Sequence, residues 1–281
     1  MNLSEIQTFL AIVETGQLNR AAHHLNVTQS TITARLNGLE DKIGQVLFHR
    51  RKSGAELTSA GFRFERYAQL MVDIWRQARQ ETALPSMVEM VFNLGCHSDL
   101  WPGFGESLFR HVQQSERNIA LSAWSGDQST LDRWLGSGLI DAALCYTPSL
   151  TDSRSEYRLK RERLILVSTA QRALQRWDPG YIYVDSGEEF RKSHAAAYPD
   201  GDTPFLTIGS AVWAKDYMLK QPDGSSVSGY LPARLIDDEI KSQRLFPVSQ
   251  APEFYRNTYL VVNDDAAQHW PWLAETVVAF S

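Results

Sequence analysis

Three short helical patterns in the first 44 residues constrain the fold of this 281-residue chain more than any other feature. Apolar residues recur three or four positions apart in residues 3–13, 18–25 and 32–43, as on one face of a helix. Gly16 ends the first pattern and Gly44 ends the third, whereas Thr28 is a favourable N-cap before the third. The sequence therefore predicts a small, three-helix unit at the N-terminus.

The third predicted helix begins with polar side chains. A short helix, a tight turn at Asn26-Val27 and a second helix with a polar start form the helix-turn-helix arrangement. Hydroxyl, amide and guanidinium groups at such a start can reach base edges or phosphates in the major groove. The candidate DNA-contacting residues are Gln29, Ser30, Thr31, Thr33 and Arg35.

A two-stranded wing with a basic tip is predicted after this helix. Residues 46–51 and 56–58 have the character of strands, and the polar residues 52–55 form the turn between them. Arg50, Arg51 and Lys52 are candidates for contact with phosphates or with a minor groove. The alternative is a run of charge that only faces solvent, but its position directly after a helix-turn-helix favours DNA binding.

Over about 60 residues the chain resembles the N-terminal domain of LysR-type transcriptional regulators. The matching stretches occur in the family's order and spacing: Phe9-Leu10, 19–25 (NRAAHHL), Thr28-Gln29-Ser30, Leu39-Glu40, Ile43-Gly44, Leu47-Phe48 and 57–61 (LTSAG). The resemblance implies a bacterial, dimeric or tetrameric regulator and places Gln29 to Arg35 on the recognition helix. Thr33, Ala34 and Asn37-Gly38 depart from the family pattern, which leaves fewer cations on this helix.

A long helix is predicted from Thr58 or Ser59 to about Ala83, where Pro85 marks a domain boundary. Its apolar stripe packs either on its own domain or, as the family implies, on a second subunit. The candidate dimerisation residues are Tyr67, Leu70, Met71, Ile74 and Ala78. The predicted divisions are a winged helix-turn-helix domain (1–58), a linker helix (59–85) and a regulatory domain (86–281).

The regulatory domain alternates strands and helices, which indicates a parallel sheet flanked by helices. The resemblance implies a periplasmic-binding-protein type of α/β domain, so the fold class is α+β and α/β. It also implies two subdomains, the first about 86–150 and 260–281 and the second about 151–259, with an effector cleft between them. Tyr230-Leu231-Pro232 resembles a turn of the family.

Turns at the carboxyl ends of the predicted strands supply the candidate effector-binding residues. For Ser98 and Ser210 the alternative is an ordinary helix cap, and for Trp101 it is core packing. Asp99 would repel an anion, so it either caps a helix or favours a cationic or zwitterionic ligand. The Ser98–Trp101 turn, with Arg35, resembles the HdfR-like subgroup of the family. The candidate residues are His97, Ser98, Asp99, Trp101, Gln128, Ser129, Tyr146, Thr147 and Ser210.

Enzyme and metal signatures are not found in the sequence: GxSxG, P-loop, HExxH and CxxC motifs are absent. We therefore expect no catalytic residues, no metal and no cofactor besides a small-molecule effector of unknown identity. Cys96 and Cys145 end neighbouring predicted strands, so a redox pair or soft-metal site with His97 and Asp99 is a minor alternative to two buried thiols.

The formal net charge of −5 is unevenly distributed. Residues 28–63 hold six Lys and Arg against three Asp and Glu, whereas residues 86–281 hold 18 against 25. No apolar stretch approaches the ~20 residues that span a bilayer, and no signal peptide is found, so we expect a cytoplasmic protein with no membrane partner.

These features predict a sequence-specific, oligomeric DNA-binding regulator of the LysR type that is modulated by a small-molecule effector. Its expected partners are double-stranded promoter DNA, a second copy of itself and RNA polymerase. The alternatives are an effector-independent repressor with a vestigial cleft, a cysteine-based redox or metal sensor, and a solute-binding or redox protein that merely carries a helical N-terminal domain.

Overall fold

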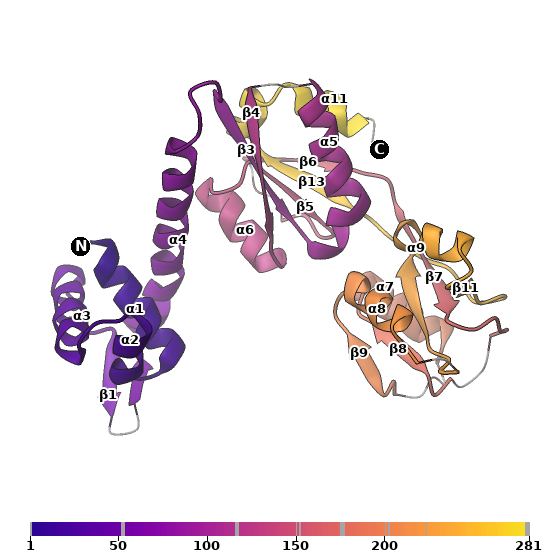
Figure 1. Cartoon of the computed structure of the whole chain (residues 1–281), viewed down its shortest axis with the longest axis horizontal. Helices are drawn as coiled ribbons and strands as arrows, with labels where there is room; N and C mark the ends of the chain where they lie inside the picture. The colour runs from indigo at the N-terminus through magenta and orange to yellow at the C-terminus, as the bar shows by residue number, and fades with distance from the viewer. Residues whose placement is uncertain are drawn as a thin grey trace. The chain divides into compact units, whose positions relative to one another are not determined.

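The chain folds into two compact units, one ending at Ser86 and the other beginning at Met87 (Figure 1). This computed structural model describes residues 2–51, 54–115, 118–149, 151, 153–174, 178–199, 201, 203–222 and 224–278. Each unit is described by itself below.

The first unit contains the three helices that the sequence predicts: α1 (Leu3–Thr15), α2 (Leu18–His24) and α3 (Gln29–Ile43). Asn2 and Glu5 form a reciprocal capping box at the start of α1, and the Thr28 side chain caps α3. Gly16 and Gly44 follow α1 and α3 with φ of 68° and 72°, the left-handed conformation that glycine adopts without strain.

The core of the first unit is made by the apolar faces of these helices. They bury Phe9, Ile12, Ile32, Leu36 and Leu39 completely, and Leu47 joins them from the following segment. The Phe9 ring packs against those of Phe48 and Phe64 with centroids 5.2 and 5.1 Å apart. This packing fixes α3, so its opposite face is left for solvent.

The wing consists of β1 (Phe48–Arg51) and β2 (Gly54–Leu57), an antiparallel pair with Phe48 opposite Leu57. The backbone N–H of Ala55 donates to the carbonyl of Gly16 at 2.8 Å, which anchors the wing to the end of α1. Gly54 has φ 145°, and a Cβ there would lie 2.5 Å from the Gly16 oxygen, so a larger residue cannot take this place. Lys52 lies outside the described residues.

The long helix α4 (Ser59–Thr82) is capped by the Thr58 side chain. Its first turn packs tightly on the chain before the wing, because a Cβ on Gly61 would lie 2.2 Å from the Leu47 carbonyl oxygen. Ala68 is buried, and Met71 and Val72 pack against the core of the unit. Part of the apolar stripe of α4 is therefore used within its own unit.

The first sheet of the second unit has the strand order β4-β3-β5-β13-β6. β3 is parallel to β4 and β5, whereas β13 runs antiparallel to β5 and β6. The strands are β3 (Met90–Cys96), β4 (Ile119–Ser125), β5 (Ala142–Cys145), β6 (Arg154–Arg158) and β13 (Tyr259–Asn263). The helices are α5 (Glu106–Ser115), α6 (Gln128–Ser137), α10 (Asp264–His269) and α11 (Trp272–Val278).

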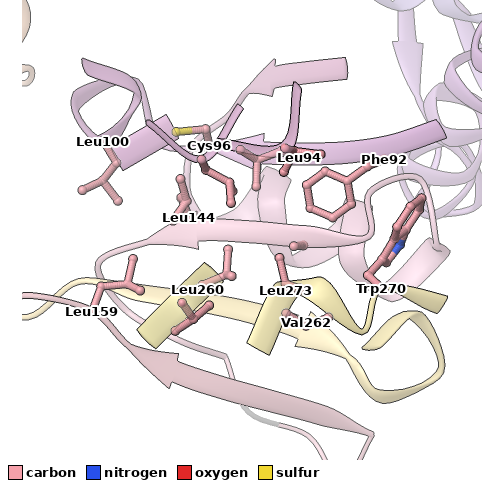
Figure 2. Packing of buried hydrophobic residues seen from close by; sticks show 14 residues of the cluster. Phe92, Leu94, Cys96, Leu100, Leu144, Leu159, Leu260, Val262, Trp270 and Leu273 are labelled. Carbon is pink, nitrogen blue, oxygen red and sulfur yellow. The ribbon is translucent and has the colours of Figure 1, made fainter. Parts of the chain in front are cut away.

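Two separate clusters of buried side chains cover the two faces of this sheet. One joins β3, β5 and β13 to α5 and to the chain around Trp270, whose ring lies 5.2 Å from that of Phe92 (Figure 2). The other packs Leu131 and Leu135 of α6 on Ile140 and Val261. Successive side chains of a strand point to opposite faces of the sheet, so the sheet lies between two layers of helices and each face has its own core.

The second sheet has the order β11-β7-β10-β8-β9, and β12 also pairs with β7. α8 and α9 pack on one face, through Met218 and Ile236, and Phe190 of α7 packs on the other. The strands are β7 (Glu162–Ser168), β8 (Tyr181–Val184), β9 (Leu206–Ile208), β10 (Ser228–Pro232), β11 (Phe246–Pro247) and β12 (Phe254–Arg256). The helices are α7 (Glu188–Ala197), α8 (Ala211–Leu219) and α9 (Ala233–Lys241).

The expected fold class is confirmed, and three details differ from the sequence prediction. β6 was placed with residues 151–259 of the second subdomain, but it pairs with β13 in the first sheet. The apolar pattern of residues 100–114 predicts a helix from Leu100, but the helix begins only at Glu106, because Pro102 (ψ 123°) and Gly103 (φ 89°) are not helical. Tyr230-Leu231-Pro232 is not a turn but the buried end of β10.

Candidate nucleic-acid interface and regulatory contacts

The start of α3 presents polar side chains on the surface of the first unit. Gln29 and Ser30 are exposed, and Thr31, Thr33 and Arg35 are half-buried. The Thr31 hydroxyl lies 2.8 Å from that of Thr28, and the Thr33 hydroxyl donates to the Gln29 carbonyl at 3.1 Å. All five residues thus lie on one short stretch of helix whose other face is fixed in the core.

The wing arginine Arg50 is held by side chains of α3. Its guanidinium donates to the Asn37 amide oxygen at 2.5 Å and lies 3.8 Å from the Glu40 carboxylate. Glu40 also accepts the backbone N–H of Leu47 at 2.7 Å, which ties the start of the wing to α3. The sequence did not indicate these roles of Asn37 and Glu40, because they depend on a contact between separate elements.

Arg51 points to a different partner, Glu56, across the hairpin. The two charged groups lie 3.1 Å apart and their side chains are 62% and 56% exposed. Such exposed pairs contribute little to stability because solvent screens them. Arg51 can therefore exchange this carboxylate for a phosphate at small cost.

A buried carboxylate beneath α3 accounts for Gly38, which the sequence alone did not explain. The Lys42 ammonium lies 2.6 Å from Glu5, whose side chain is 9% exposed. This hydrogen bond lowers the pKa of the Glu5 carboxyl from its usual value. A Cβ at position 38 would lie 3.2 Å from the same carboxylate, so glycine leaves room for the ion pair.

On α4, the candidate dimerisation residues divide into two groups. Met71 packs against the core of its own unit. Tyr67 and Ile74 are 51% and 44% exposed, Ala78 is exposed and Leu70 is half-buried. Trp75, which was not among the candidates, is 52% exposed. The exposed part of this stripe is apolar and lies at helical spacing.

In the second unit, two of the candidate effector residues contact each other directly. The Asp99 carboxylate accepts from the Ser210 hydroxyl at 2.6 Å and from the backbone N–H groups of Ala211 and Val212 at 2.9 and 3.3 Å. Asp99 is 2% exposed and Ser210 is 4% exposed. Ser210 also caps α8. Asp99 therefore occupies the helix N-terminus that the sequence assigned to a ligand.

Arg234 reinforces the same contact from α9. Its guanidinium donates to the backbone carbonyls of Asp99 and Pro102 and to the Glu162 carboxylate. These bonds join the chain after β3 to the second sheet. Each of the three guanidinium nitrogens thus donates to a carbonyl or carboxylate oxygen, which offsets the cost of partly burying the charge.

Arg256 extends the network on the other side of Glu162. Arg256 is 5% exposed and donates to Glu162 at 2.6 Å and to the Tyr146 hydroxyl at 2.6 Å. Its guanidinium lies 3.6 Å from the centroid of the Tyr146 ring, and burial raises the pKa of that tyrosine well above its usual value. Glu162, Arg234 and Arg256 are residues that sequence reasoning missed.

The remaining candidates lie at or near this network or on separate surfaces. The His97 ring contacts that of Tyr146 at 5.0 Å, and burial lowers its pKa. Trp101 packs on Phe109 at 5.2 Å, in agreement with the core-packing alternative. Gln128 donates to Asp132 and Ser129 to Asp127, whereas Ser98 and Thr147 are exposed. The structure thus brings His97, Asp99, Tyr146 and Ser210 into one network.

The two cysteines lie on opposite faces of the first sheet. Cys96 belongs to the buried cluster with Leu144, and Cys145 belongs to the cluster of α6. Burial raises the pKa of both thiols to about 12, so both are protonated at neutral pH. Within the described residues, no group of three or more His, Cys, Asp and Glu side chains is arranged to hold a metal ion.

Known proteins are similar to this chain in sequence. Residues 3–62 match the sequence family described as "Bacterial regulatory helix-turn-helix protein, lysR family". The HTH-type transcriptional regulator HdfR of Shigella boydii serotype 18 is 28% identical over 218 residues, covering 76% of this chain and 77% of that protein.

Solved structures of full-length regulators share the fold. CbnR complexed with its target DNA matches with a TM-score of 0.70 at 16% identity, covering 100% of both chains. LysG from Corynebacterium glutamicum with bound effector Arg matches with a TM-score of 0.52 at 17% identity, covering 99% of this chain and 97% of that one.

The three helices and the following hairpin make the first unit a winged helix-turn-helix domain. Residues 3–62 therefore match the lysR family of bacterial regulatory helix-turn-helix proteins, and the chain as a whole is similar to LysR-type transcriptional regulators in sequence and in fold. In the part of the chain that the structure describes, no helix is long and apolar enough to cross a membrane.

Proposed function

We propose that this regulator binds an interrupted palindrome of promoter DNA through the polar start of α3 and the wing. Gln29, Ser30, Thr31, Thr33 and Arg35 read base edges and nearby phosphates, and Arg50, Arg51 and Lys52 bind the backbone or a minor groove. The observation that carries the proposal is the bond from Arg50 to Asn37, which orients a wing cation from the recognition helix itself.

The regulator acts as a homodimer or homotetramer, because one recognition helix reads too few bases for useful specificity. The exposed apolar stripe of α4 supports pairing with a second copy through Tyr67, Leu70, Ile74 and Ala78. Met71 contributes from the edge that also packs on its own unit. A regulator that binds promoter DNA and contacts RNA polymerase acts in the bacterial cytoplasm.

A small-molecule effector modulates this activity by altering how the two subdomains of the second unit meet, and no other cofactor is required. LysG, which shares the fold, was solved with bound effector Arg. A ligand in the expected cleft would act on the network of Asp99, Ser210, Arg234 and Tyr146, since these residues join the two subdomains.

A second candidate function, effector-independent repression, is favoured by one observation. The Asp99 carboxylate already occupies the N-terminus of α8, with three hydrogen bonds and 2% exposure. A regulator whose cleft is filled by its own side chain has no need of a ligand there. A thermal shift screen of metabolites distinguishes the two candidates, because only the effector-modulated protein responds.

The test of DNA binding combines genome-wide mapping of bound sites with fluorescence anisotropy on the strongest site. Arg35→Ala should weaken specific binding by roughly 5- to 150-fold, the effect of ~1–3 kcal/mol for a lost base contact. Arg79→Ala, which removes an exposed cation from the end of α4, is the matched control and should bind nearly as the parent does. Equal loss in both variants would contradict the site assignment.

A further inference from the structure

The second subdomain contains a pocket that is separate from the Asp99 network and has not been assigned a role so far. Its walls come from β8, β10, α7 and the segments on either side of these elements. The aromatic and charged side chains that line it include Arg172, Tyr181, His194, Tyr198, Phe205 and Tyr230. The pocket lies on the face of the sheet that packs on α7, opposite α8 and α9.

The polar atoms of the aromatic wall are uncharged. The Tyr181 hydroxyl lies 2.8 Å from His194 Nε2, and the Tyr198 hydroxyl lies 2.7 Å from that of Tyr230. Burial lowers the pKa of His194 and raises the pKa of Tyr181 and Tyr198, so these groups are neutral at pH 7. The wall therefore offers flat aromatic faces with neutral hydrogen-bonding groups.

The charges beside the pocket neutralise each other. Arg172 pairs with the Asp178 carboxylate through two nitrogen atoms. Asp178 also accepts the backbone N–H of Gly180 at 2.9 Å and the Ser228 hydroxyl. An anionic ligand would have to compete with Asp178 for Arg172. A cationic ligand would have to compete with Arg172 for Asp178. This balance favours an uncharged ligand.

The rim of the pocket carries a large apolar side chain that the protein does not cover. Phe205 is 83% exposed, although Tyr230, which lines the same pocket, is completely buried. An aromatic ring seated in the pocket would bury part of Phe205 and stack against the tyrosines, which is a favourable arrangement. The exposure of Phe205 and the neutral aromatic wall both favour an uncharged aromatic ligand.

We propose that this pocket binds an uncharged, planar aromatic small molecule. The site goes beyond the proposed cleft, because it lies within one subdomain and uses none of Asp99, Ser210, Arg234 or Tyr146. It rests on the proposed function only in that such a molecule would act as a signal for a regulator.

The experiment compares four ring compounds of similar size that differ in charge, by saturation-transfer NMR and calorimetric titration of the full chain. Benzamide and indole are uncharged, benzoate is an anion and benzamidine is a cation. We expect saturable binding of benzamide or indole with a Kd on the order of 1 mM or tighter, and at least about 10-fold weaker binding of the two ions. No saturation by either uncharged compound, or equal binding of the ions, overturns the proposal.

Two variants locate the binding. Phe205→Ala should weaken it about 2- to 10-fold, the loss of one aromatic contact, and Ala173→Trp should abolish it by placing a large side chain at a lining position. Trp213→Ala removes a 69% exposed aromatic side chain from α8, which packs on the other face of the sheet, and should leave binding unchanged. Binding that survives Ala173→Trp in a folded protein contradicts the site.

Specific DNA binding is measured on the same samples without ligand. A protein that binds DNA but none of the uncharged compounds refutes the pocket alone. A protein that binds benzamide or indole but no DNA refutes the proposed function and leaves the pocket standing.

Discussion

Asp99 and Ser210 are 111 residues apart in the chain, yet the carboxylate of one accepts a 2.6 Å hydrogen bond from the hydroxyl of the other in a buried environment. The same carboxylate accepts two backbone N–H groups of α8, so it balances the partial positive charge of a helix N-terminus. A contact of this kind stabilises one arrangement of the two subdomains.

Removing this carboxylate should destabilise the second unit. Asp99→Ala leaves the Ser210 hydroxyl and two backbone donors without their acceptor, which should cost about 1–3 kcal/mol in urea-induced unfolding of the full chain. Asp185→Ala is the matched control, because its pair with Arg191 is exposed. Formate, which replaces the lost carboxylate, should restore part of the stability. Equal stability of the two variants would show that Asp99 does not hold the subdomains.

The Asp99 contact also marks the limit of what the sequence predicted. Thr28, Gly16 and Gly44 specify helix ends through their own side chains and backbone, so the helix-turn-helix was predictable from local pattern. The sequence placed Asp99 and Ser210 at strand ends and identified both as candidate caps. It did not show that they cap the same helix, because that depends on the docking of two subdomains.

Glu162, Arg234 and Arg256 escaped sequence analysis for the same physical reason. Glu162 meets Arg256 across 94 residues and Arg234 meets the Asp99 carbonyl across 135. None of the three has a local pattern that distinguishes it from an ordinary surface charge. Similarly, the range 151–259 was assigned to the second subdomain, although β6 within it belongs to the first sheet, because only its pairing with β13 decides.

The orientation of Arg50 by Asn37 should affect DNA affinity. Asn37→Ala frees the wing arginine from α3 without removing a cation, so specific affinity should fall by about 3- to 10-fold through the cost of ordering one side chain. The dependence of binding on salt should stay close to that of the parent, because the number of phosphate contacts is the same. Arg50→Ala should weaken binding and should also reduce the slope of the logarithm of the binding constant against the logarithm of the salt concentration (the salt slope). An unchanged salt slope in Arg50→Ala argues that this residue does not contact phosphate.

The exposed stripe of α4 should control the oligomeric state. Ile74→Glu introduces a charge at a 44% exposed apolar position and should shift the protein toward monomers in analytical ultracentrifugation at micromolar concentration. The helix itself should persist, since glutamate is a good helix former. Gln80→Glu, also exposed near the end of α4, serves as the control for added charge. Dimers of undiminished stability in Ile74→Glu exclude this face as the interface.

Both thiols should be inert in the folded protein. Their pKa values of about 12 leave almost no thiolate at pH 7, and both side chains are 2% exposed. Ellman's reagent should therefore label neither cysteine in the native state and both after denaturation. Replacing both by serine should leave the response of DNA binding to peroxide unchanged. Rapid labelling of either thiol in the folded protein would contradict this prediction and favour the redox alternative.

The ion pair of Glu5 and Lys42 should make the first unit sensitive to acid. The pKa of Glu5 is lowered in the folded protein, so the stabilisation is present above the unfolded pKa of about 4.5 and is lost as the pH falls through the lower, folded value. Glu5→Gln should flatten the pH dependence of the free energy of unfolding between about pH 5 and about pH 3, the range around and below the ordinary pKa of glutamate. Glu14→Gln, which changes an exposed carboxylate of the same helix, is the control. Identical profiles for the two variants would contradict a role for the pair.

Gly38 should be tolerant of substitution only when Glu5 is absent. In an ordinary helix interior Gly→Ala stabilises by about 1 kcal/mol. Here the new methyl group would lie 3.2 Å from a carboxylate that Lys42 holds in place at 2.6 Å. Gly38→Ala should therefore gain little or lose stability in the parent, but should recover about 1 kcal/mol in a Glu5→Ala background. A double-mutant cycle by urea denaturation measures this coupling, and additive effects would mean that the glycine has another cause.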